Sequence, residues 1–337
     1  MTSLRVAIDG TPLTVKTGGV RRYTAELLQA LRQCFPDDCY ALVSDQLNRP
    51  TSAIHRRWWL WGLRREMERM RADLFHGTDF AVPYLPSRPS VVTVHDLSPW
   101  RKETAAAASR RVRRRTPLLL RLGLATFVIT PSAAVRREVI EYFRLPASRV
   151  IAVPLAASGI FQPTVMHLPR SPYFLYVGTI EKRKNVELLT RCWREIRKTV
   201  DVELLIVGRM KDAVNLEGAT VLGVLPDEDL PALYSGALAT LYPSSYEGFG
   251  LPVLEAMQCG AMVITSKDPA ITEVAGGAAV QVDIHDESGW VEAMRSALTE
   301  PNRAAWRDRG LRRAAGFSWQ QTAKLTREVY VEALRGR

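Results

Sequence analysis

Two glutamates, Glu247 and Glu255, flank a glycine-containing turn in the stretch EGFGLPVLE. An apolar strand is expected before the turn, and a helix is expected to begin at Pro252, because proline favours the first helical position. The free amides at such a helix start attract an anion or hydroxyl oxygens near Gly250 and Leu251. Two carboxylates at the carboxyl end of a parallel strand can each hold a pair of neighbouring hydroxyls, as on ribose or a hexose. The alternative is a dipole-compensating Glu255 and a solvated Glu247.

A second group of chemically active residues lies in the stretch YVGTIEKRKN. A strand is expected to end at Gly178, and a basic loop then leads into a helix that begins near Asn185. Arg183 and Lys184 would place two cations beside a helix N-terminus, which suits a diphosphate. The alternative is an exposed basic turn.

Two polar sites in the first half follow expected strands in the same way. Gly18 and Gly19 open a helix and permit close backbone approach to a ligand. His95 and Asp96 end a strand, at the edge where open α/β sheets bind ligands. A structural role for the histidine is the alternative.

Other catalytic signatures are incomplete or missing. The stretch GFGLPV, followed by Asp268, resembles a dinucleotide fingerprint, but Val253 replaces the third glycine. No phosphate-binding P-loop, nucleophile elbow or HExxH zinc motif is present. Four cysteines without CxxC spacing and five histidines offer no metal site.

The elements that position these residues alternate along the chain, as in parallel sheets covered on both faces. The expected strands are Leu4–Asp9, Cys39–Ser44, Leu74–His76, Val91–His95, Phe127–Thr130, Val150–Val153, Phe174–Val177, Val202–Val207, Thr220–Leu222, Ala239–Tyr242, Met262–Thr265 and Ala279–Val282. The expected helices are Tyr23–Phe35, Arg56–Arg71, Glu103–Arg115, Ala133–Phe143, Val186–Lys198, Glu228–Ser235, Pro252–Cys259 and Ser288–Leu298.

A stretch rich in proline and glycine, residues 156–172, lacks periodicity and is expected to link two domains. We therefore expect an α/β protein with Rossmann-like domains at residues 1–160 and 170–316. Ser318 and Gln321 form a capping-box pattern that begins a terminal helix, residues 318–337.

Length and charge are consistent with this organisation. The 337 residues suffice for two domains, and the net charge of +11 favours anionic partners. No signal peptide is visible, and the apolar stretch Leu118–Val135 is broken by Arg121 and Pro131, so no membrane span is expected. The expected location is cytoplasmic, at most peripheral on the inner face of the cytoplasmic membrane.

With these motifs in order, the chain resembles the family 4 glycosyltransferases of the GT-B fold. The matching segments are Gly18–Gly19, His95–Asp96, Thr130–Ser132, Gly178–Asn185, the E-x7-E motif Glu247–Glu255 and Phe317–Trp319. The resemblance implies two Rossmann-like domains facing a cleft, with the last helix packed back on the N-terminal domain. It further implies transfer from a nucleotide diphosphate-sugar with retention of configuration and without an obligatory metal or other cofactor.

The resemblance also implies residue roles. Glu247, His95, Arg183 and Lys184 would be catalytic, with Glu255 on the ribose and Glu247 on the donor sugar. The implied donor-binding set is Gly18, Gly19, Gly178, Thr179, Arg183, Lys184, Gly208, Val224, Glu247, Gly248, Phe249, Gly250, Leu251 and Glu255. Asp96 and Tyr23 would lie on the acceptor side. Many relatives carry an arginine where this chain has Thr179, which leaves the division of labour between Arg183 and Lys184 open.

Charge development suggests a mechanism. Fixed cations and a helix dipole would stabilise the departing diphosphate, where other enzymes use Mg²⁺. We expect a front-face displacement in which the departing phosphate oxygen takes the acceptor proton. Glu247 is then a positioning residue, not the covalent nucleophile of a retaining glycosidase.

The sequence says less about the identity of the donor and of the partners. GDP-mannose is the favoured donor, with rhamnose, glucose or GlcNAc donors as alternatives, and the expected acceptor is a saccharide or lipid-linked saccharide. The segments Arg110–Arg115 and Trp58–Trp61 suit an anionic membrane surface, or a solvated basic helix over buried tryptophans. A non-catalytic sugar-nucleotide sensor stays open. A nucleic-acid-binding protein is disfavoured, because it leaves the glutamates unexplained.

Overall fold

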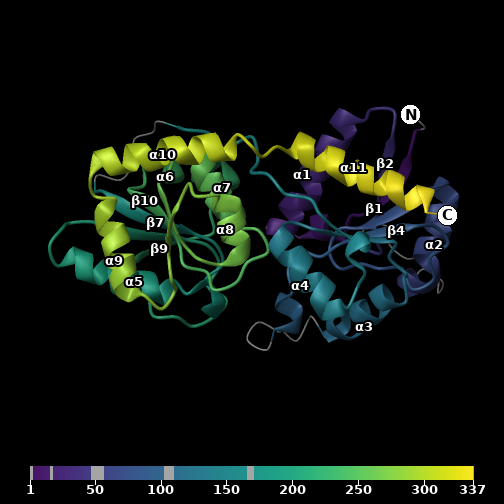
Figure 1. The fold of residues 1–337 in the computed structure, drawn as a ribbon, viewed down its shortest axis with the longest axis horizontal. Helices are drawn as coiled ribbons and strands as arrows, with labels where there is room; N and C mark the ends of the chain where they lie inside the picture. Colours follow the sequence, from purple (N-terminus) through teal and green to yellow (C-terminus); the bar gives the residue numbers. More distant parts are fainter. Residues whose placement is uncertain (1–2, 16–17, 47–56, 102–109, 165–170, 337) are drawn as a thin grey trace. The chain divides into compact units, whose positions relative to one another are not determined.

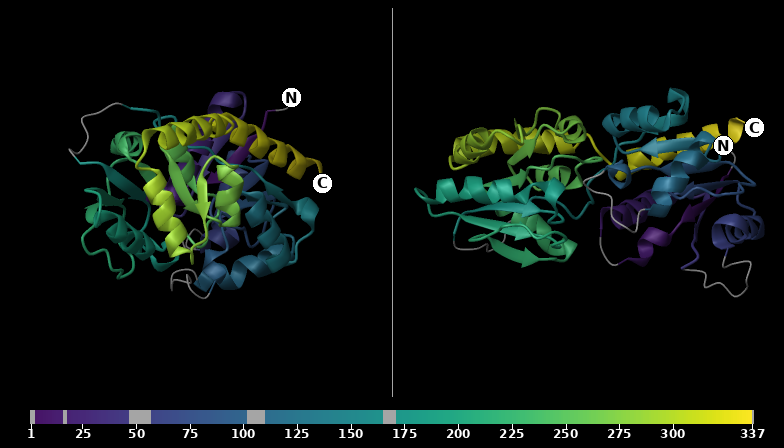
Figure 2. Two further views of the ribbon diagram at one scale, coloured as in Figure 1. Left: turned by 60° about the vertical axis from the view of Figure 1, so that its left-hand side comes forward. Right: turned by 90° about the horizontal axis from the view of Figure 1, so that it is seen from below.

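In the computed structural model, the described residues are 3–15, 18–46, 57–101, 110–164 and 171–336. The chain divides into two units (Figure 1). Unit 1 combines Met1–Leu155 with Trp319–Arg337, and unit 2 is Ala156–Ser318. In each unit a sheet forms a layer between helices, as Figure 2 shows. The expectation of two parallel α/β sheets is confirmed.

Unit 1 contains a six-stranded parallel sheet in the order β2-β1-β3-β4-β5-β6. Its strands are β1 (Arg5–Asp9), β2 (Cys39–Val43), β3 (Leu74–Gly77), β4 (Ser90–Thr93), β5 (Phe127–Thr130) and β6 (Val150–Ala152). The central strands β3 and β4 are buried along their whole length, as their continuous apolar pattern predicts. The functional loops therefore follow strand ends that packing on both faces holds in place.

The helices of unit 1 differ from the expected ones in several of their bounds. They are α1 (Gly19–Cys34), α2 (Leu63–Met70), α3 (Arg110–Arg121), α4 (Ala133–Phe143) and α11 (Trp319–Arg335). A π-helical turn, Trp58–Gly62, precedes α2. The expected end of α3 at Arg115 is wrong, since the helix continues through Pro117. Proline cannot donate to the carbonyl four residues earlier, and here Trp100 Nε1 donates to that Arg113 oxygen at 3.0 Å.

The terminal helix α11 belongs to unit 1 and packs against α1 and β4. A buried chain of polar groups joins it to the sheet. The Tyr330 hydroxyl lies 2.7 Å from His76 Nδ1, and His76 Nε2 lies 2.8 Å from Thr93 Oγ1. Burial lowers the pKa of His76 to about 3, so the imidazole is neutral at physiological pH.

Unit 2 contains a second six-stranded parallel sheet in the order β12-β11-β10-β7-β8-β9. Its strands are β7 (Tyr173–Val177), β8 (Glu203–Val207), β9 (Thr220–Gly223), β10 (Ala239–Tyr242), β11 (Val263–Ser266) and β12 (Val280–Val282). All five residues of β7 are buried. The central strands β7 and β10 are neighbours, so the loops after them emerge side by side at one edge.

The helices of unit 2 include two that the sequence analysis did not anticipate. They are α5 (Val186–Arg197), α6 (Leu230–Gly236), α7 (Leu251–Gln258), α8 (Pro269–Ala275), α9 (Glu287–Ser296) and α10 (Glu300–Ala314). The unanticipated ones are α8 and α10. Asp268 caps α8, because its carboxylate accepts hydrogen bonds from the Ala270 and Ile271 amides.

Candidate functional site

The two charged motifs of unit 2 meet at the carboxyl edge of its sheet. Lys184 follows β7 and Glu247 follows β10, and the Lys184 ammonium bonds the Glu247 carboxylate directly. Lys184 Nζ also lies 3.0 Å from the Tyr242 hydroxyl. Lys184 is 6% exposed and Glu247 8%. The expected alternatives, an exposed basic turn and a solvated loop glutamate, are therefore wrong for these two residues.

Arg183 occupies the same cluster but is bound to the protein. Its Nε lies 2.8 Å from Glu181, and its Nη1 donates to the Tyr246 carbonyl at 2.8 Å. The Nη1 atom also lies 3.6 Å from Glu247 Oε2. In return, the Ser245 amide and hydroxyl donate to the Arg183 carbonyl. Arg183 thus fastens the β10 loop to the β7 loop.

Burial and charge oppose each other in this cluster. Burial acts to raise the pKa of Glu247, but Lys184 and Arg183 outweigh it and hold the pKa below its ordinary value. Burial lowers the pKa of Lys184, against the attraction of Glu247. The carboxylate is consequently charged at neutral pH and held between two cations.

The glycine-containing turn after Glu247 leads into α7. Gly250 has φ +99°, a left-handed conformation that glycine tolerates best, and it caps the helix. The helix begins at Leu251, one residue earlier than expected, so Pro252 is its second residue. The amides of Phe249 and Gly250 donate no hydrogen bond to another described residue. They are suitable donors for an oxygen-rich ligand.

Asp268 stabilises this turn through hydrogen bonds. Its Oδ2 accepts a 3.3 Å hydrogen bond from the Glu247 amide, while Oδ1 caps α8. Burial raises the pKa of Asp268 to about 6. Asp268 therefore positions Glu247, a role that the dinucleotide comparison did not suggest.

Glu255 lies inside α7 and is 1% exposed. The Tyr234 hydroxyl of α6 donates to its Oε2 at 3.2 Å. Glu255 and Lys184 are both buried in unit 2. Ribose binding by Glu255 stays a prediction.

The loops after β7 and β8 run side by side past the sheet. Ile180 and Met210 form a parallel bridge, and the Ile180 amide donates to the Arg209 carbonyl at 2.8 Å. A side chain at Gly208 would place its Cβ 1.8 Å from the Gly178 oxygen, so this approach requires glycine.

The bridge makes Thr179 and Arg209 neighbours on one side of the paired loops. Glu181 and Lys211, two residues further on, form an ion pair at 3.4 Å, which shows that odd-numbered positions share a side. Arg209 is exposed, and its guanidinium has no ion pair to a described residue. Met210 (51% exposed) and Val224 (52%) add apolar surface at this edge.

In unit 1, His95 lies after β4 with a defined tautomer. Its Nε2 donates to the Thr78 carbonyl at 2.8 Å, which leaves Nδ1 as an acceptor when the ring is neutral. Asp96 accepts from the Ser98 amide at 2.8 Å. Gly18 caps α1, with φ +132°, and Gly19 is its first residue.

The acceptor-side role expected for Tyr23 is wrong. Tyr23 is 1% exposed, and its hydroxyl lies 2.8 Å from Thr93 Oγ1 inside the unit. Its ring packs edge-on against His95, with centroids 4.8 Å apart. Tyr23 is therefore a support beneath His95 rather than a surface for a ligand.

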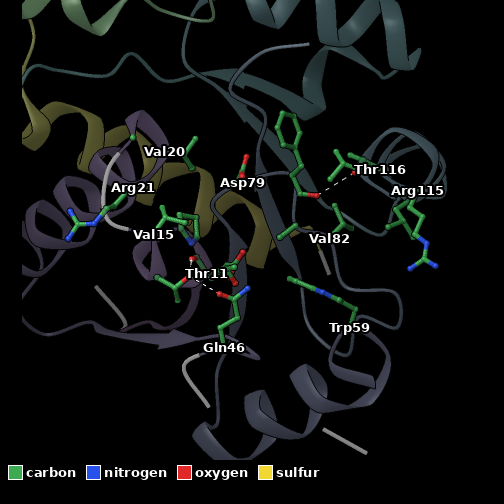
Figure 3. Close-up of a pocket in the computed structure, with 18 of the residues that line it drawn as sticks. Thr11, Val15, Val20, Arg21, Gln46, Trp59, Asp79, Val82, Arg115 and Thr116 are labelled. Carbon is green, nitrogen blue, oxygen red and sulfur yellow. Dashed lines mark hydrogen bonds between the residues drawn. The ribbon is translucent and has the colours of Figure 1, made fainter. Parts of the chain in front are cut away.

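A pocket of about 510 Å³ opens at the carboxyl edge of the unit 1 sheet (Figure 3). It is lined by Gly18 and Gly19 together with residues from the loops after β1, β2 and β3 and from α3. Its lining residues include Asp9, Thr11, Gln46, Trp59, Asp79 and Arg115.

The segments expected to meet a membrane divide between core and surface. Trp58 is 4% exposed and packs in a core cluster with Ala7 and Phe75, while Trp61 is 46% exposed. Trp58 therefore does not belong to the expected surface of tryptophan and arginine side chains that would meet a membrane. On α3, Leu118 is 57% exposed, residues 113–115 are exposed, and the side chains of residues 110 and 111 lie outside the described residues.

None of the described helices is both long and apolar enough to cross a bilayer. In the described part of the chain, His, Cys, Asp and Glu side chains form no group of three arranged for a metal ion.

Known proteins are similar to this chain in sequence and in fold. The family model described as Glycosyltransferase Family 4 matches residues 17–156, and the model described as Glycosyl transferases group 1 matches residues 166–313. The O-antigen chain mannosyltransferase B of Escherichia coli is 31% identical over 310 residues, which cover 82% of this chain and 78% of that protein. The chain belongs to the family 4 glycosyltransferases.

Solved structures share the fold of this glycosyltransferase. Sucrose-phosphate synthase from Thermosynechococcus elongatus superposes with a TM-score of 0.77 at 19% identity, covering 99% of this chain and all of that one (100%). Anabaena HepE, solved in complex with UDP-glucose, has a TM-score of 0.72 at 15% identity and covers 98% of this chain and 100% of its own. The expected GT-B architecture is confirmed.

Four residues of the unit 1 pocket and of the paired loops and glycine turn of unit 2 were not predicted as site residues: Trp59, Asp79, Arg209 and Asp268. Three of them directly follow or closely follow a strand end, where ligand-binding residues gather, and that position was the available signal. Trp59 lies on the turn before α2, and no local pattern separates it from the buried Trp58.

Proposed function

We propose that this glycosyltransferase moves a hexose from a nucleotide diphosphate-sugar, with GDP-mannose as the favoured donor, to a saccharide or lipid-linked saccharide during polysaccharide assembly. The observation that carries the proposal is the buried Lys184–Glu247 pair beside the α7 N-terminus. At this edge of the sheet, the Lys184 ammonium suits a phosphate of such a donor, and the amides at the start of α7 suit another of its oxygens. The Glu247 carboxylate suits a sugar hydroxyl. The mannosyltransferase name of the similar E. coli protein supports the choice of sugar.

In the proposed reaction, C–O cleavage places negative charge on the diphosphate and positive charge on the sugar. Lys184 and the α7 dipole stabilise the diphosphate where its charge develops. The phosphate oxygen takes the acceptor proton, and the sugar keeps its configuration without a metal. Glu247, held by Lys184 and by the Asp268 bond to its amide, orients the sugar hydroxyls.

In this proposal, the cations that neutralise the diphosphate differ from those expected from the sequence. Here Arg183 holds the loop in place, because its Nε pairs with Glu181 and its Nη1 donates to the Tyr246 carbonyl. The cation that many relatives carry at position 179 is supplied by Arg209, which is the cross-loop neighbour of Thr179. Lys184 and Arg209 are then the diphosphate cations.

The test is a panel of GDP-, UDP-, dTDP- and ADP-sugars, scored by thermal shift and by nucleotide release with and without saccharide acceptors. We expect one donor to stabilise the native state and to release its nucleotide faster when acceptor is present. Binding without acceptor-dependent release identifies a sensor instead. Binding of oligonucleotides with a steep salt dependence, and of no nucleotide sugar, contradicts the proposal.

The acceptor carrier is proposed from the outer face of α3. Exposed arginines at positions 113 and 114 lie beside Leu118 and Leu122, which is 63% exposed. Basic and apolar side chains on one helix favour an anionic bilayer surface. We expect vesicles with anionic lipid to retain the protein at low salt, and Leu118→Ser with Leu122→Ser to weaken retention. Equal retention by neutral vesicles contradicts this assignment.

A further inference from the structure

Four buried polar side chains connect the terminal helix α11 to α1 through the sheet of unit 1. The Tyr330 hydroxyl of α11 lies 2.7 Å from His76 Nδ1, and His76 Nε2 lies 2.8 Å from Thr93 Oγ1. Thr93 Oγ1 in turn lies 2.8 Å from the Tyr23 hydroxyl of α1. These four side chains are the polar chain, and each is at most 1% exposed. Buried polar groups that are paired in this way hold one another in a single arrangement.

His76 couples the two halves of the polar chain. Burial, and after it the neighbouring His95, lowers the pKa of His76 to about 3, so the ring is neutral at neutral pH. A neutral imidazole carries one N–H, so a nitrogen that accepts from Tyr330 requires the other nitrogen to donate to Thr93. Thr93 Oγ1 is shared by the bonds to His76 and to Tyr23. A change at Tyr330 is therefore passed on to Tyr23, although the two tyrosines lie on different helices.

The helix α11 also contacts the ring of Tyr23. Trp319, the first residue of α11, lies with its ring centroid 6.2 Å from that of Tyr23. The hydroxyl of Tyr23 is thus held through the polar chain, and its ring is held by Trp319. Both contacts depend on α11 being packed against α1.

Tyr23 in turn limits the orientation of His95. The two rings meet at 81°, with centroids 4.8 Å apart. The other fixed point of His95 is the 2.8 Å bond from Nε2 to the Thr78 carbonyl. One hydrogen bond fixes the place of one ring atom but leaves the tilt of the ring plane free. The contact with Tyr23 removes this freedom and so determines the direction of Nδ1, to which no described residue donates a hydrogen bond.

We propose that the polar chain positions His95, so that the packed helix α11 sets the direction of its Nδ1 atom. The members of the chain are positioning residues, because they are buried and act on a ligand only through His95. The inference rests on the proposed function for the part that His95 takes in the transfer. The positioning itself belongs to unit 1 and can be measured without a donor. Breaking the chain should slow the transfer while donor binding, provided by the Lys184–Glu247 pair of unit 2, is retained.

The first experiment observes His95 directly and without substrate. The full chain, which contains five histidines, is labelled with ¹⁵N-histidine, and the ring nitrogens are recorded by NMR; His95→Gln identifies the His95 signals. We expect Nε2 of the neutral ring to carry the proton, as its bond to the Thr78 carbonyl requires. Tyr330→Phe and Thr93→Val should both shift the His95 signals. Thr93→Ser keeps a hydroxyl and should leave them where they are in the unchanged protein.

Arg327→Met is the matched control, because it weakens the packing of α11 without removing a member of the polar chain. Arg327 Nε lies 2.6 Å from Asp38 Oδ2, and its Nη2 lies 3.2 Å from Asp38 Oδ1. This variant should lower the urea unfolding midpoint at least as much as Tyr330→Phe and yet leave the His95 signals unchanged. Equal shifts in Arg327→Met and Tyr330→Phe overturn the inference, because His95 would then respond to loss of stability alone.

The second experiment measures transfer with the donor that the panel identifies. Tyr330→Phe and Thr93→Val should lower kcat about tenfold, the effect of a misplaced reacting group, and leave the donor KM unchanged within about twofold. Thr93→Ser and Arg327→Met should keep the kcat of the unchanged protein. Tyr330→Phe keeps the test valid if Thr93→Val does not fold, because phenylalanine retains the ring.

A double variant tests whether the chain acts as one unit. Tyr330→Phe and Tyr23→Phe break the same chain at its two ends, so the double variant should be no slower than the slower single variant. Losses that multiply in the double variant, His95 signals that do not move in Tyr330→Phe, or full activity of His95→Gln overturn the inference. Shifted His95 signals in a protein that binds no nucleotide sugar overturn the proposed function instead.

Discussion

The buried pair Lys184–Glu247 makes a prediction that separates stability from catalysis. Lys184→Met removes the ammonium and leaves the Glu247 carboxylate with Arg183 at 3.6 Å as its nearest remaining cation. Breaking one side of a buried ion pair costs about 3–5 kcal/mol of unfolding free energy. Glu247→Gln keeps an oxygen for the ammonium, and Lys184 keeps the Tyr242 hydroxyl at 3.0 Å. We therefore expect this variant to lose less, about 1–3 kcal/mol.

The double variant Lys184→Met/Glu247→Gln removes both charges. Its loss of stability should be smaller than the sum of the single losses by about 1–3 kcal/mol, because neither charge is left buried without its partner. Activity should behave differently. Each single variant should lower kcat by about 10²–10³-fold, the cost of one charge-stabilising group, and the double variant should stay at least as inactive.

The assay is a double-mutant cycle measured twice on the same four proteins. Urea unfolding gives the stability coupling, and nucleotide release in the presence of acceptor gives kcat. Arg194→Met, which removes an exposed ion pair with Glu217, is the control and should change neither quantity appreciably. The reasoning is refuted if the double variant regains activity together with stability, because the pair would then be structural only.

Three further predictions follow from single contacts. Lowering the pH from 6.5 towards 3 should lower the free energy of unfolding by about 1.4 kcal/mol per pH unit. The reason is that His76 is protonated in the unfolded state over this range, whereas in the folded state its pKa is about 3. Urea unfolding midpoints measured across this pH range should show a shallower slope for His76→Gln. Asp268→Ala should cost about 1 kcal/mol as a lost cap and lower kcat by loosening the turn that it bonds, while Asp268→Asn should restore the stability but only part of kcat; unchanged kcat in Asp268→Ala would remove its positioning role. Arg209→Ala should raise the donor KM about tenfold, the value of one charge-assisted bond, and adding Thr179→Arg should restore it; no rescue would show that the two positions do not share a ligand.

Strands were the features best predicted from sequence. The observed β5 and β10 begin and end at the expected residues, because continuous apolar runs between turns have few other places in a parallel sheet. The end of α3 was predicted wrongly, since Pro117 is accommodated by a side chain outside the helix, the Trp100 indole. Local pattern rules do not include such partners.

The sequence identified the residues of the site more accurately than the contacts between them. Lys184 and Glu247 were both identified, but their direct pairing depends on β7 and β10 being neighbours, which no local pattern encodes. For the same reason the contacts of Arg183 with the Tyr246 carbonyl and Glu181 were not anticipated. Tyr23 was misjudged because its burial depends on packing contributed by distant segments, including an aromatic contact with Trp319 of α11.

The central claim is that unit 2 recognises a diphosphate joined to a sugar through Lys184. Its most direct test is calorimetric titration of the full chain with the favoured nucleotide diphosphate-sugar and with the corresponding nucleoside monophosphate. We predict that the diphosphate-sugar binds at least tenfold more tightly, and that Lys184→Met abolishes most of this difference while the monophosphate affinity changes little. Equal affinity for both ligands, or an undiminished preference in Lys184→Met, would contradict the account.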